Sequence, residues 1–145
     1  MRVLLQRVSA ASVSVAGEVI GKIGCGLCAL VGVGVGDDAH VADRIAAKIW
    51  HLRLFPDDAG NMNRSAAELG LAVLVVSQFT LYADATRGRR PSFVHAAPPE
   101  QAEALVERVA AQLREAGAEV ATGRFGAKMQ VSLVNEGPVT VMVEL

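Results

Sequence analysis

The sequence has few aromatic residues, few cysteines and no excess of either charge. Aromatic side chains make up 4% of the 145 residues, so the core must be built from the aliphatic and alanine side chains that raise the hydrophobic share to 52%. The formal net charge is −1, which excludes a protein-wide positive field that would attract nucleic acid. Any contact with nucleic acid must therefore come from a local cluster of positive charge.

Long apolar runs are also missing. No stretch approaches the roughly 20 residues that span a bilayer, and Arg7 interrupts the apolar N-terminal segment, which suits a strand better than a signal peptide. Two cysteines are too few for the disulfide framework of a secreted domain. We therefore expect a soluble cytoplasmic protein without a membrane partner, folded as a single domain over residues 1–145.

Hydrophobic periodicity predicts an α/β fold. Helices are expected between Asp37 and Phe55 and between Pro99 and Gly117, with a polar turn at 57–64 and an irregular loop at 85–99. Strands are expected at residues 2–8, 12–15, 19–20, 24–35, 71–81, 119–122, 129–134 and 139–144. This order predicts layered sheets, a hairpin layer plus a main sheet, with the two helices packed on one face.

The central predicted strand changes character at its end. It begins as a buried apolar run at residues 74–76 and then places Ser77, Gln78 and Thr80 in succession without a turn residue. Ligands of α/β proteins bind at such strand ends. An unpaired buried polar group costs roughly 1–3 kcal/mol, so these side chains need partners. The strand end is therefore the first candidate site.

Two short motifs resemble a redox site and a dinucleotide-binding loop, but the residues around them do not fit either site. The redox spacing of Cys25 and Cys28 lies between predicted strands, whereas a reactive pair starts a helix whose dipole lowers the thiol pKa. We favour two small apolar core residues. A dinucleotide loop is suggested by Gly32-Val33-Gly34-Val35-Gly36, but its third glycine comes one position early and no acidic residue follows about 20 residues on. A plain strand-to-helix turn is favoured.

Metal and triad chemistry are not indicated. The histidines, His40, His51 and His95, lack metal-ligand spacing, so we expect no metal and no cofactor. Ser77 is outside any G-x-S-x-G elbow. The sequence leaves open whether His95 approaches Ser77 or Thr80 in space.

Two further features of the sequence, a basic cluster and a Gly-Pro pair, each have two possible interpretations. Guanidinium groups bind phosphates through paired hydrogen bonds, so the basic cluster of Arg87, Arg89 and Arg90 suits an RNA backbone, although a solvated loop is the simpler interpretation. The Gly137-Pro138 pair lies between two predicted strands. Because X-Pro bonds are cis in only about 5–6% of folded cases, physics alone favours a plain connection there, whereas a cis bond would make a sharp corner.

Taken together, the motifs are similar to those of a known family. Residues 77–84 (SQFTLYAD) and 135–140 (NEGPVT) resemble the two signature motifs of the D-aminoacyl-tRNA deacylases, also called D-Tyr-tRNA deacylases. Residues 1–8, 88–93 and 122–127 resemble that family as well. The resemblance runs from end to end. Its departures are Cys25 and Cys28, which fall in a stretch we expect to vary, and Glu136, where Asp is common.

The resemblance implies a function and an assembly. Members cleave the ester that joins a D-amino acid, or glycine, to the terminal ribose of tRNA, and they act as cytosolic homodimers. The Gly-Pro peptide of the family is cis and enters the partner's active site. Carried over, Gly137 and Pro138 would face Ser77 to Thr80 of the other chain and reject L-aminoacyl-tRNA, with no DNA partner.

The same resemblance assigns roles to the remaining site residues. Ser77, Gln78, Phe79 and Thr80 would form the catalytic segment, with backbone N–H groups near Phe79 and Thr80 as an oxyanion hole. Phe125 lines the substrate pocket, and Met129 is either a pocket wall or ordinary core. Arg87, Arg89 and Arg90 would contact tRNA.

Some alternatives stay open at this point. Thr80 is either a nucleophile or a positioning group, and no adjacent base marks it as a nucleophile. A non-catalytic module that binds the tRNA acceptor end would use the same arginines. A generic small-ester hydrolase would leave those arginines without a role.

Overall fold

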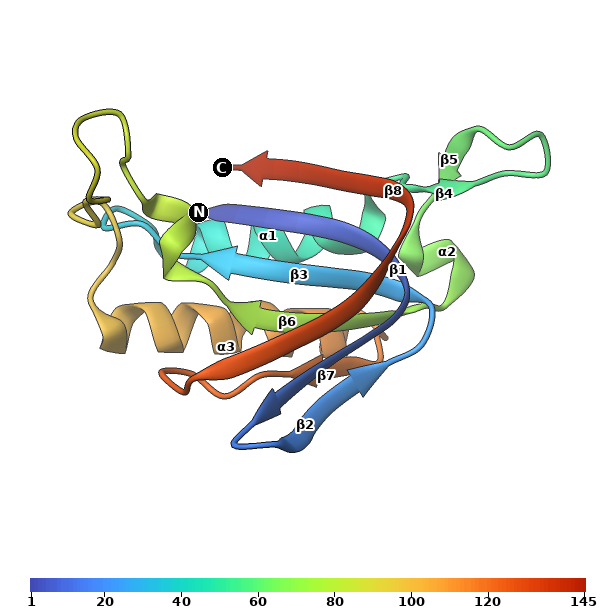
Figure 1. Cartoon of the computed structure of the whole chain (residues 1–145). Helices are drawn as coiled ribbons and strands as arrows, with labels where there is room; N and C mark the ends of the chain where they lie inside the picture. Colours follow the sequence, from blue (N-terminus) through green and yellow to red (C-terminus); the bar gives the residue numbers. More distant parts are fainter.

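A six-stranded sheet runs through the protein, and the computed structural model describes all residues, 1–145 (Figure 1). Its strands follow the order β2-β1-β3-β6-β7, and β8 pairs with β1 on the other side. Their bounds are β1 Arg2–Val15, β2 Glu18–Ile23, β3 Gly26–Gly32, β6 Ala72–Ser77, β7 Val120–Thr122 and β8 Met129–Glu144. The β3–β6 and β6–β7 pairs are parallel, and the pairs formed by β1 are antiparallel.

The N-terminal strand is longer than its sequence pattern suggests. Residues predicted as two strands form one, β1, and the run predicted at 24–35 is the shorter β3. Two strands share one edge of β1. β2 pairs with its C-terminal part, where Val15 lies opposite Glu18, and β3 pairs with its N-terminal part, where Arg2 lies opposite Gly32. The predicted hairpin of residues 12–15 and 19–20 is the β1–β2 pair. Together with β8, which pairs along β1, it forms the hairpin layer that curves over the sheet (Figure 1).

Two helices cover one face of the sheet, as predicted. They are α1, Ala39–His51, and α3, Pro99–Glu115. The Asp38 side chain caps α1 by accepting a hydrogen bond from the Val41 N–H at 2.9 Å. The spacing of apolar residues predicted both helices, because residues three and four positions apart lie on the same face of a helix.

The stretch after α1 contains structure that the periodicity did not predict. A two-stranded hairpin, β4 Phe55–Pro56 and β5 Met62–Arg64, encloses part of the expected polar turn, and a third, short helix, α2 Ala66–Leu69, follows. Ser65 and Glu68 form a capping box at its start. That S-x-x-E pattern was visible in the sequence and would have predicted the helix.

Both faces of the central strands are buried. In β6, Val73 and Val75 belong to the core under the helices, whereas Leu74 and Val76 belong to a second core under the curved hairpin layer. Strands covered on both sides read as continuous apolar runs, which is what residues 72–76 show. The single-domain α/β architecture with layered sheets is therefore the observed one, with the small β4–β5 sheet added.

The central strand ends earlier than predicted. β6 stops at Ser77, and residues Phe79–Tyr82 form a single turn of 3₁₀ helix, η1. The Gln78 N–H donates to the Val31 carbonyl at 2.7 Å, near the end of β3. β3 itself ends one residue later, at Gly32, and the chain turns into η1 and presents its polar residues at the edge of the sheet.

The last strand is continuous and carries a bulge, where two strands joined through residues 135–138 were predicted. Val8 pairs with Asn135 and Gln6 with Thr140, so residues 136–139 stand opposite Arg7 alone. Such bulges are common beside functional sites. The peptide bond between Gly137 and Pro138 within the bulge is cis.

No helix of the protein combines the length and the apolar character that crossing a membrane requires.

The two cysteines differ, so the prediction that both are core residues is wrong for one of them. Cys28 is buried in the second core, but Cys25 is exposed at the bend between β2 and β3. Burial raises the pKa of the Cys28 thiol to about 11.

This difference gives a test of the core. At pH 8 we expect a disulfide reagent to modify one thiol of the folded protein rapidly and both thiols after unfolding, because the Cys28 thiol is buried and uncharged. Cys25→Ser should remove the rapid phase, and Cys28→Ser should leave it. A rapid reaction of two thiols in the folded protein would contradict this burial.

Candidate active site

A cavity of about 590 Å³ opens at the carboxyl end of β6. Its volume is within the range of small-molecule sites, and its position is where α/β proteins bind ligands. Ten of its fourteen lining residues are hydrophobic. The walls come from β6, η1, the loop before α3, α3 itself, the loop leading into β8 and the first residues of β8. They include Ser77, Gln78, Phe79, Phe93, Phe125, Met129 and Val131.

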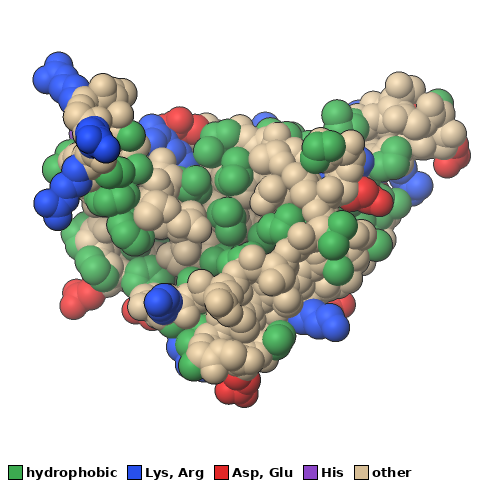
Figure 2. Space-filling view, in the orientation of Figure 1, with side chains coloured by type: hydrophobic (Ala, Val, Ile, Leu, Met, Phe, Trp, Pro, Cys, Tyr) green, Lys and Arg blue, Asp and Glu red, His purple; other side chains and the backbone are tan.

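Two aromatic rings stand in the wall of this cavity. Phe79 and Phe93 meet edge to face with centroids 5.1 Å apart, yet their exposed fractions are 54% and 37%. Hydrophobic side chains gather on this side of the molecule, below a projecting loop that carries positive charge (Figure 2). Exposed apolar surface of this kind marks a place where a ligand or another chain binds.

The polar groups at the end of β6 are linked to each other. The Gln78 amide Nε2 donates to the Thr80 Oγ1, and Ser77 is half-buried beside them. Because η1 starts at Phe79, the first N–H groups of this turn, those of Phe79 and Thr80, have no partner inside it. The segment therefore offers free backbone donors next to an apolar cavity.

His95 lines a separate cleft with Tyr82 and Asp84, outside the cavity that Ser77 lines. The hydrogen bond to the Thr80 hydroxyl comes from Gln78 and not from a histidine. No three histidine, cysteine or carboxylate side chains gather in a way that could hold a metal ion.

The structure brings the predicted pocket walls to the cavity. Phe125 and Met129 both line it, and Met129 also packs against the second core. A Cβ atom at Gly123 would lie 2.6 Å from the Met129 sulfur, so the glycine makes room for this side chain. Phe125 and Ser77 also border a second cavity of about 670 Å³ against α3.

The three predicted tRNA-contacting arginines lie outside the cavity. Arg87, Arg89 and Arg90 are exposed on a loop closed at its base by paired backbone hydrogen bonds between Asp84 and Ser92. None of the three makes a salt bridge, and Phe93 of the cavity wall follows the loop directly. Their charge is thus available to a ligand that reaches past the cavity.

The Gly137-Pro138 bulge does not reach the cavity of its own chain. The bulge stands opposite Arg7, which pairs with Leu27, whereas the Gln78 N–H bonds to Val31. Neither Gly137 nor Pro138 is among the residues that line the cavity, whereas Ser77, Gln78 and Phe79 are. The predicted site residues therefore form two separate groups within one chain.

Arg7 is a residue whose role the sequence did not reveal. Its Nη1 donates to the Leu54 carbonyl at 2.7 Å, its Nε lies 3.7 Å from a Glu136 carboxylate oxygen, and a Cβ atom at Gly137 would lie 2.9 Å from its Nη2. The guanidinium thus lies against the bulge. In the sequence, Arg7 looks like an ordinary residue of the strand predicted at 2–8. Only the register of β8 on β1 shows that it contacts the bulge.

An α/β fold with an apolar cavity and free backbone donors at the end of a parallel strand defines a class of small-ligand-binding proteins, often enzymes. The sequence profile of the D-Tyr-tRNA(Tyr) deacylase family matches residues 4–144. The chain belongs to this family, as the sequence motifs indicated.

Three known proteins show how similar the relatives are. A protein named D-aminoacyl-tRNA deacylase from Thermomicrobium roseum is 57% identical over 144 residues, which cover 99% of this chain and 94% of the relative. A solved structure of a c-Myc DNA unwinding element binding protein has a TM-score of 0.95 at 39% identity, covering 100% of this chain and 99% of the other. A probable eukaryotic D-amino acid tRNA deacylase has a TM-score of 0.89 at 17% identity, with coverage of 99% and 98%, and supports the fold alone.

Proposed function

We propose that this protein hydrolyses the ester between a D-amino acid and the terminal ribose of tRNA. The observation that carries the proposal is the apolar cavity at the end of β6 bordered by the free N–H groups of η1, in a chain of the deacylase family. We place this activity in the cytoplasm, where charged tRNA is found.

The chemistry follows from the groups present. Water attacks the ester carbonyl carbon, and negative charge develops on the carbonyl oxygen. The N–H groups of Phe79 and Thr80 receive this charge, and such a donor is typically worth about 2.7–4 kcal/mol. The ester C–O bond then breaks, and the ribose oxygen leaves as a hydroxyl after taking up a proton that the attacking water gives up. An aminoacyl ester is already activated, so donors and positioning suffice without a nucleophilic side chain. Phe125 and Met129 form the apolar wall against which the substrate rests.

In this mechanism Thr80 positions and does not attack. Thr80→Ala should lower the single-turnover rate about fivefold, equivalent to losing one hydrogen bond of about 1 kcal/mol to Gln78. Thr80→Ser keeps the hydroxyl and should behave like the wild type. A nucleophile would lose on the order of 10⁴-fold or more when truncated, and such a loss in a rapid-quench assay would reject the positioning role.

The active unit in this proposal is a homodimer. The Gly137-Pro138 bulge does not line the cavity of its own chain, and we infer that it serves the cavity of the partner chain. Two features of β8 support a second copy: its outer edge has no partner strand, and Val131, Val134 and Met142 expose large apolar side chains along it.

Chirality is selected by backbone position. The carbonyl oxygens of Gly137 and Pro138 hold the substrate ammonium, which fixes the directions of the remaining bonds at its Cα. A D side chain then points to open space, and an L side chain meets main-chain atoms. Rejection by main chain tolerates many D side chains, and glycine passes because it has no side chain to reject.

The proposal is tested by following loss of the ester from D-Tyr-tRNA, L-Tyr-tRNA and Gly-tRNA in parallel. Rapid loss of the D form and of glycine, with the L form stable, is the expected result. Equal loss of the D and L forms would leave a hydrolase without chiral selection. Binding of all three without hydrolysis would replace the proposal with a non-catalytic acceptor-end module.

A further inference from the structure

The glycine-rich segment after β3 has a packing role that a plain turn does not require. A Cβ atom at Gly32 would lie 2.9 Å from the Gln78 carbonyl oxygen and 3.1 Å from the Leu81 Cβ, both in the segment that forms η1. A Cβ atom at Gly34 would lie 2.8 Å from both Cζ and the hydroxyl oxygen of Tyr82. The turn η1 therefore rests directly on the backbone of this segment.

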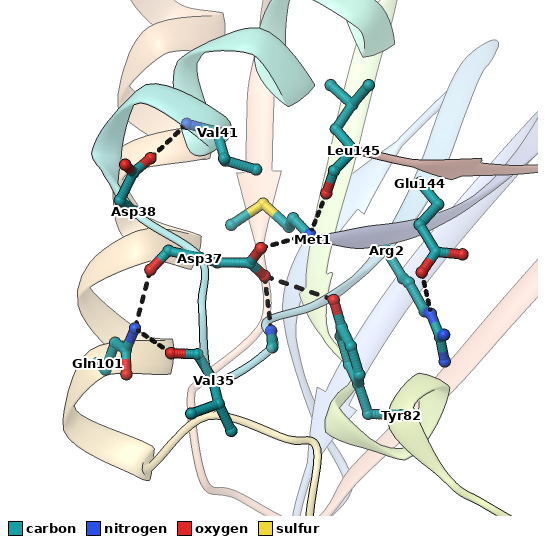
Figure 3. Close-up of polar contacts among 11 residues, drawn as sticks. Met1, Arg2, Val35, Asp37, Asp38, Val41, Tyr82, Gln101, Glu144 and Leu145 are labelled. Carbon is teal, nitrogen blue, oxygen red and sulfur yellow. Dashed lines mark hydrogen bonds and ion pairs between the residues drawn. The ribbon is translucent and has the colours of Figure 1, made fainter.

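Tyr82, the last residue of η1, is held on further sides (Figure 3). The Arg2 guanidinium lies over its ring, 4.6 Å from the centroid, and the Tyr82 hydroxyl donates to Asp37 at 3.4 Å. Asp37 is itself fixed, since it accepts the Gly34 N–H at 2.6 Å and pairs with the Met1 amine at 2.6 Å.

Arg2 also contacts the backbone of η1. Its Nη1 donates to the Leu81 carbonyl at 3.0 Å. Its Nε donates to Glu144, at the end of β8, at 2.9 Å (Figure 3). The planar guanidinium makes both bonds from donors held in a fixed geometry, which the single compact ammonium group of a lysine does not reproduce. One side chain thus ties η1 to the first and last strands of the sheet.

We propose that Arg2, Gly32, Gly34 and Tyr82 are positioning residues, which fix η1 so that the Phe79 and Thr80 N–H groups stand where the ester oxygen develops its charge. The inference rests on the proposed deacylase function. A single 3₁₀ turn has little stability of its own. Its placement therefore comes from the contacts at its Tyr82 end, and a displacement of about 1 Å at a reacting centre lowers a rate by about 10²-fold.

Tyr82 also reports on its own surroundings, because it is the only tyrosine of the chain. Burial and the nearby Asp37 carboxylate raise the pKa of the Tyr82 phenol to about 12, and the Arg2 charge acts in the opposite direction. Phenolate absorbance after a rapid pH jump therefore follows this one residue. A ring displaced from its place on Gly34 should titrate closer to the ordinary value near 10.

The decisive comparison is Gly34→Ala against Gly36→Ala in the full-length protein. A Cβ atom at Gly34 meets the Tyr82 ring, whereas at Gly36 it meets no atom within 4 Å. Gly34→Ala should lower kcat for D-Tyr-tRNA by about 10²-fold with KM changed less than about twofold, and should lower the Tyr82 pKa. Gly36→Ala should match the wild type in all three quantities.

A second variant keeps the test valid if Gly34→Ala does not fold. Arg2→Lys retains the positive charge near the ring but loses the fork, so kcat should fall about tenfold with KM unchanged. Glu144→Gln keeps an acceptor for Arg2 and should stay close to the wild type.

Three outcomes are distinguishable. Loss of kcat in Gly34→Ala and Arg2→Lys, with Gly36→Ala unaffected, supports the positioning role. Unchanged kcat in Gly34→Ala while the Tyr82 pKa falls overturns it, because the ring would have moved without consequence for the chemistry. An inactive wild-type protein defeats the proposed function itself, a result that no variant of the positioning residues can produce.

Discussion

Replacing Gly137 with alanine is expected to lower the kcat for D-aminoacyl-tRNA by about 10²-fold or more. The backbone φ angle of Gly137 is +116°, where L side chains are rarely found. An added Cβ would lie 2.8 Å from the Val139 Cγ2 and 2.9 Å from the Arg7 Nη2, so the bulge must shift. A shifted bulge no longer places its carbonyl oxygens for the substrate ammonium.

The control for Gly137→Ala is Gly117→Ala. Gly117 also has a positive φ angle, +97°, but a Cβ atom there meets no atom within 4 Å, and the residue follows α3 far from the bulge. Both variants should lose roughly 1–2 kcal/mol of unfolding free energy from the backbone alone. Only Gly137→Ala should lose turnover, and similar kcat values in the two variants would remove the bulge from the mechanism.

Mixing two inactive variants tests which chain the bulge serves. Gly137→Ala has an intact cavity, and a cavity variant such as Gln78→Ala has an intact bulge. If the bulge acts in the partner's cavity, co-refolded dimers containing one chain of each should regain one complete site, about a quarter of the wild-type sites in a random mixture. No recovery in a mixture shown to contain mixed dimers would contradict action across the dimer.

The fold could be predicted from the sequence to the extent that periodicity determines it. The spacing of Ile45 and Ile49, and of Leu105 and Val109, places apolar residues on one helix face whatever the surroundings. The apolar run at 72–76 likewise predicts a strand buried on both faces. These features depend only on the local chain, which is why both helices and the central strand were found.

The candidate site was only partly predictable, because its form depends on neighbours far away in the chain. β6 ends at Ser77, close to the end of β3, and nothing in residues 71–81 shows that limit. Arg7 lies against the bulge only through the register of β8 on β1. Gly34 resembles an ordinary turn glycine until the Tyr82 ring is placed against it.

Removing the arginine cluster should strongly weaken the binding of aminoacyl-tRNA without changing the rate of ester hydrolysis once tRNA is bound. In the triple variant Arg87→Ala/Arg89→Ala/Arg90→Ala, the slope of log KM against log salt concentration should decrease by about 2–3. Each lost phosphate contact contributes roughly 0.7–0.9 to that slope. Between about 50 and 200 mM salt, the wild-type KM should therefore rise about 20- to 40-fold more than that of the variant. The kcat at saturating tRNA should stay unchanged.

The matched control removes three positive charges from another surface. Arg44→Ala/Lys48→Ala/Arg53→Ala changes three exposed residues of α1 and the segment after it, so both variants have the same net charge. If only the overall charge mattered, the two salt dependences would decrease equally. A decrease confined to the loop variant locates the tRNA backbone beside the cavity, since the loop leads directly into Phe93 of the cavity wall.

The same pair of variants separates the remaining classes of function. A small D-amino acid ester has no phosphates, so its hydrolysis should be equal in the wild type and in both triple variants at every salt concentration. A generic esterase would show that equality for tRNA esters as well. In the proposed function the cavity holds the aminoacyl group and the loop that precedes Phe93 holds the nucleic acid, so the arginines should act on tRNA substrates alone. Chemistry and tRNA binding would then belong to adjacent but separable parts of one surface.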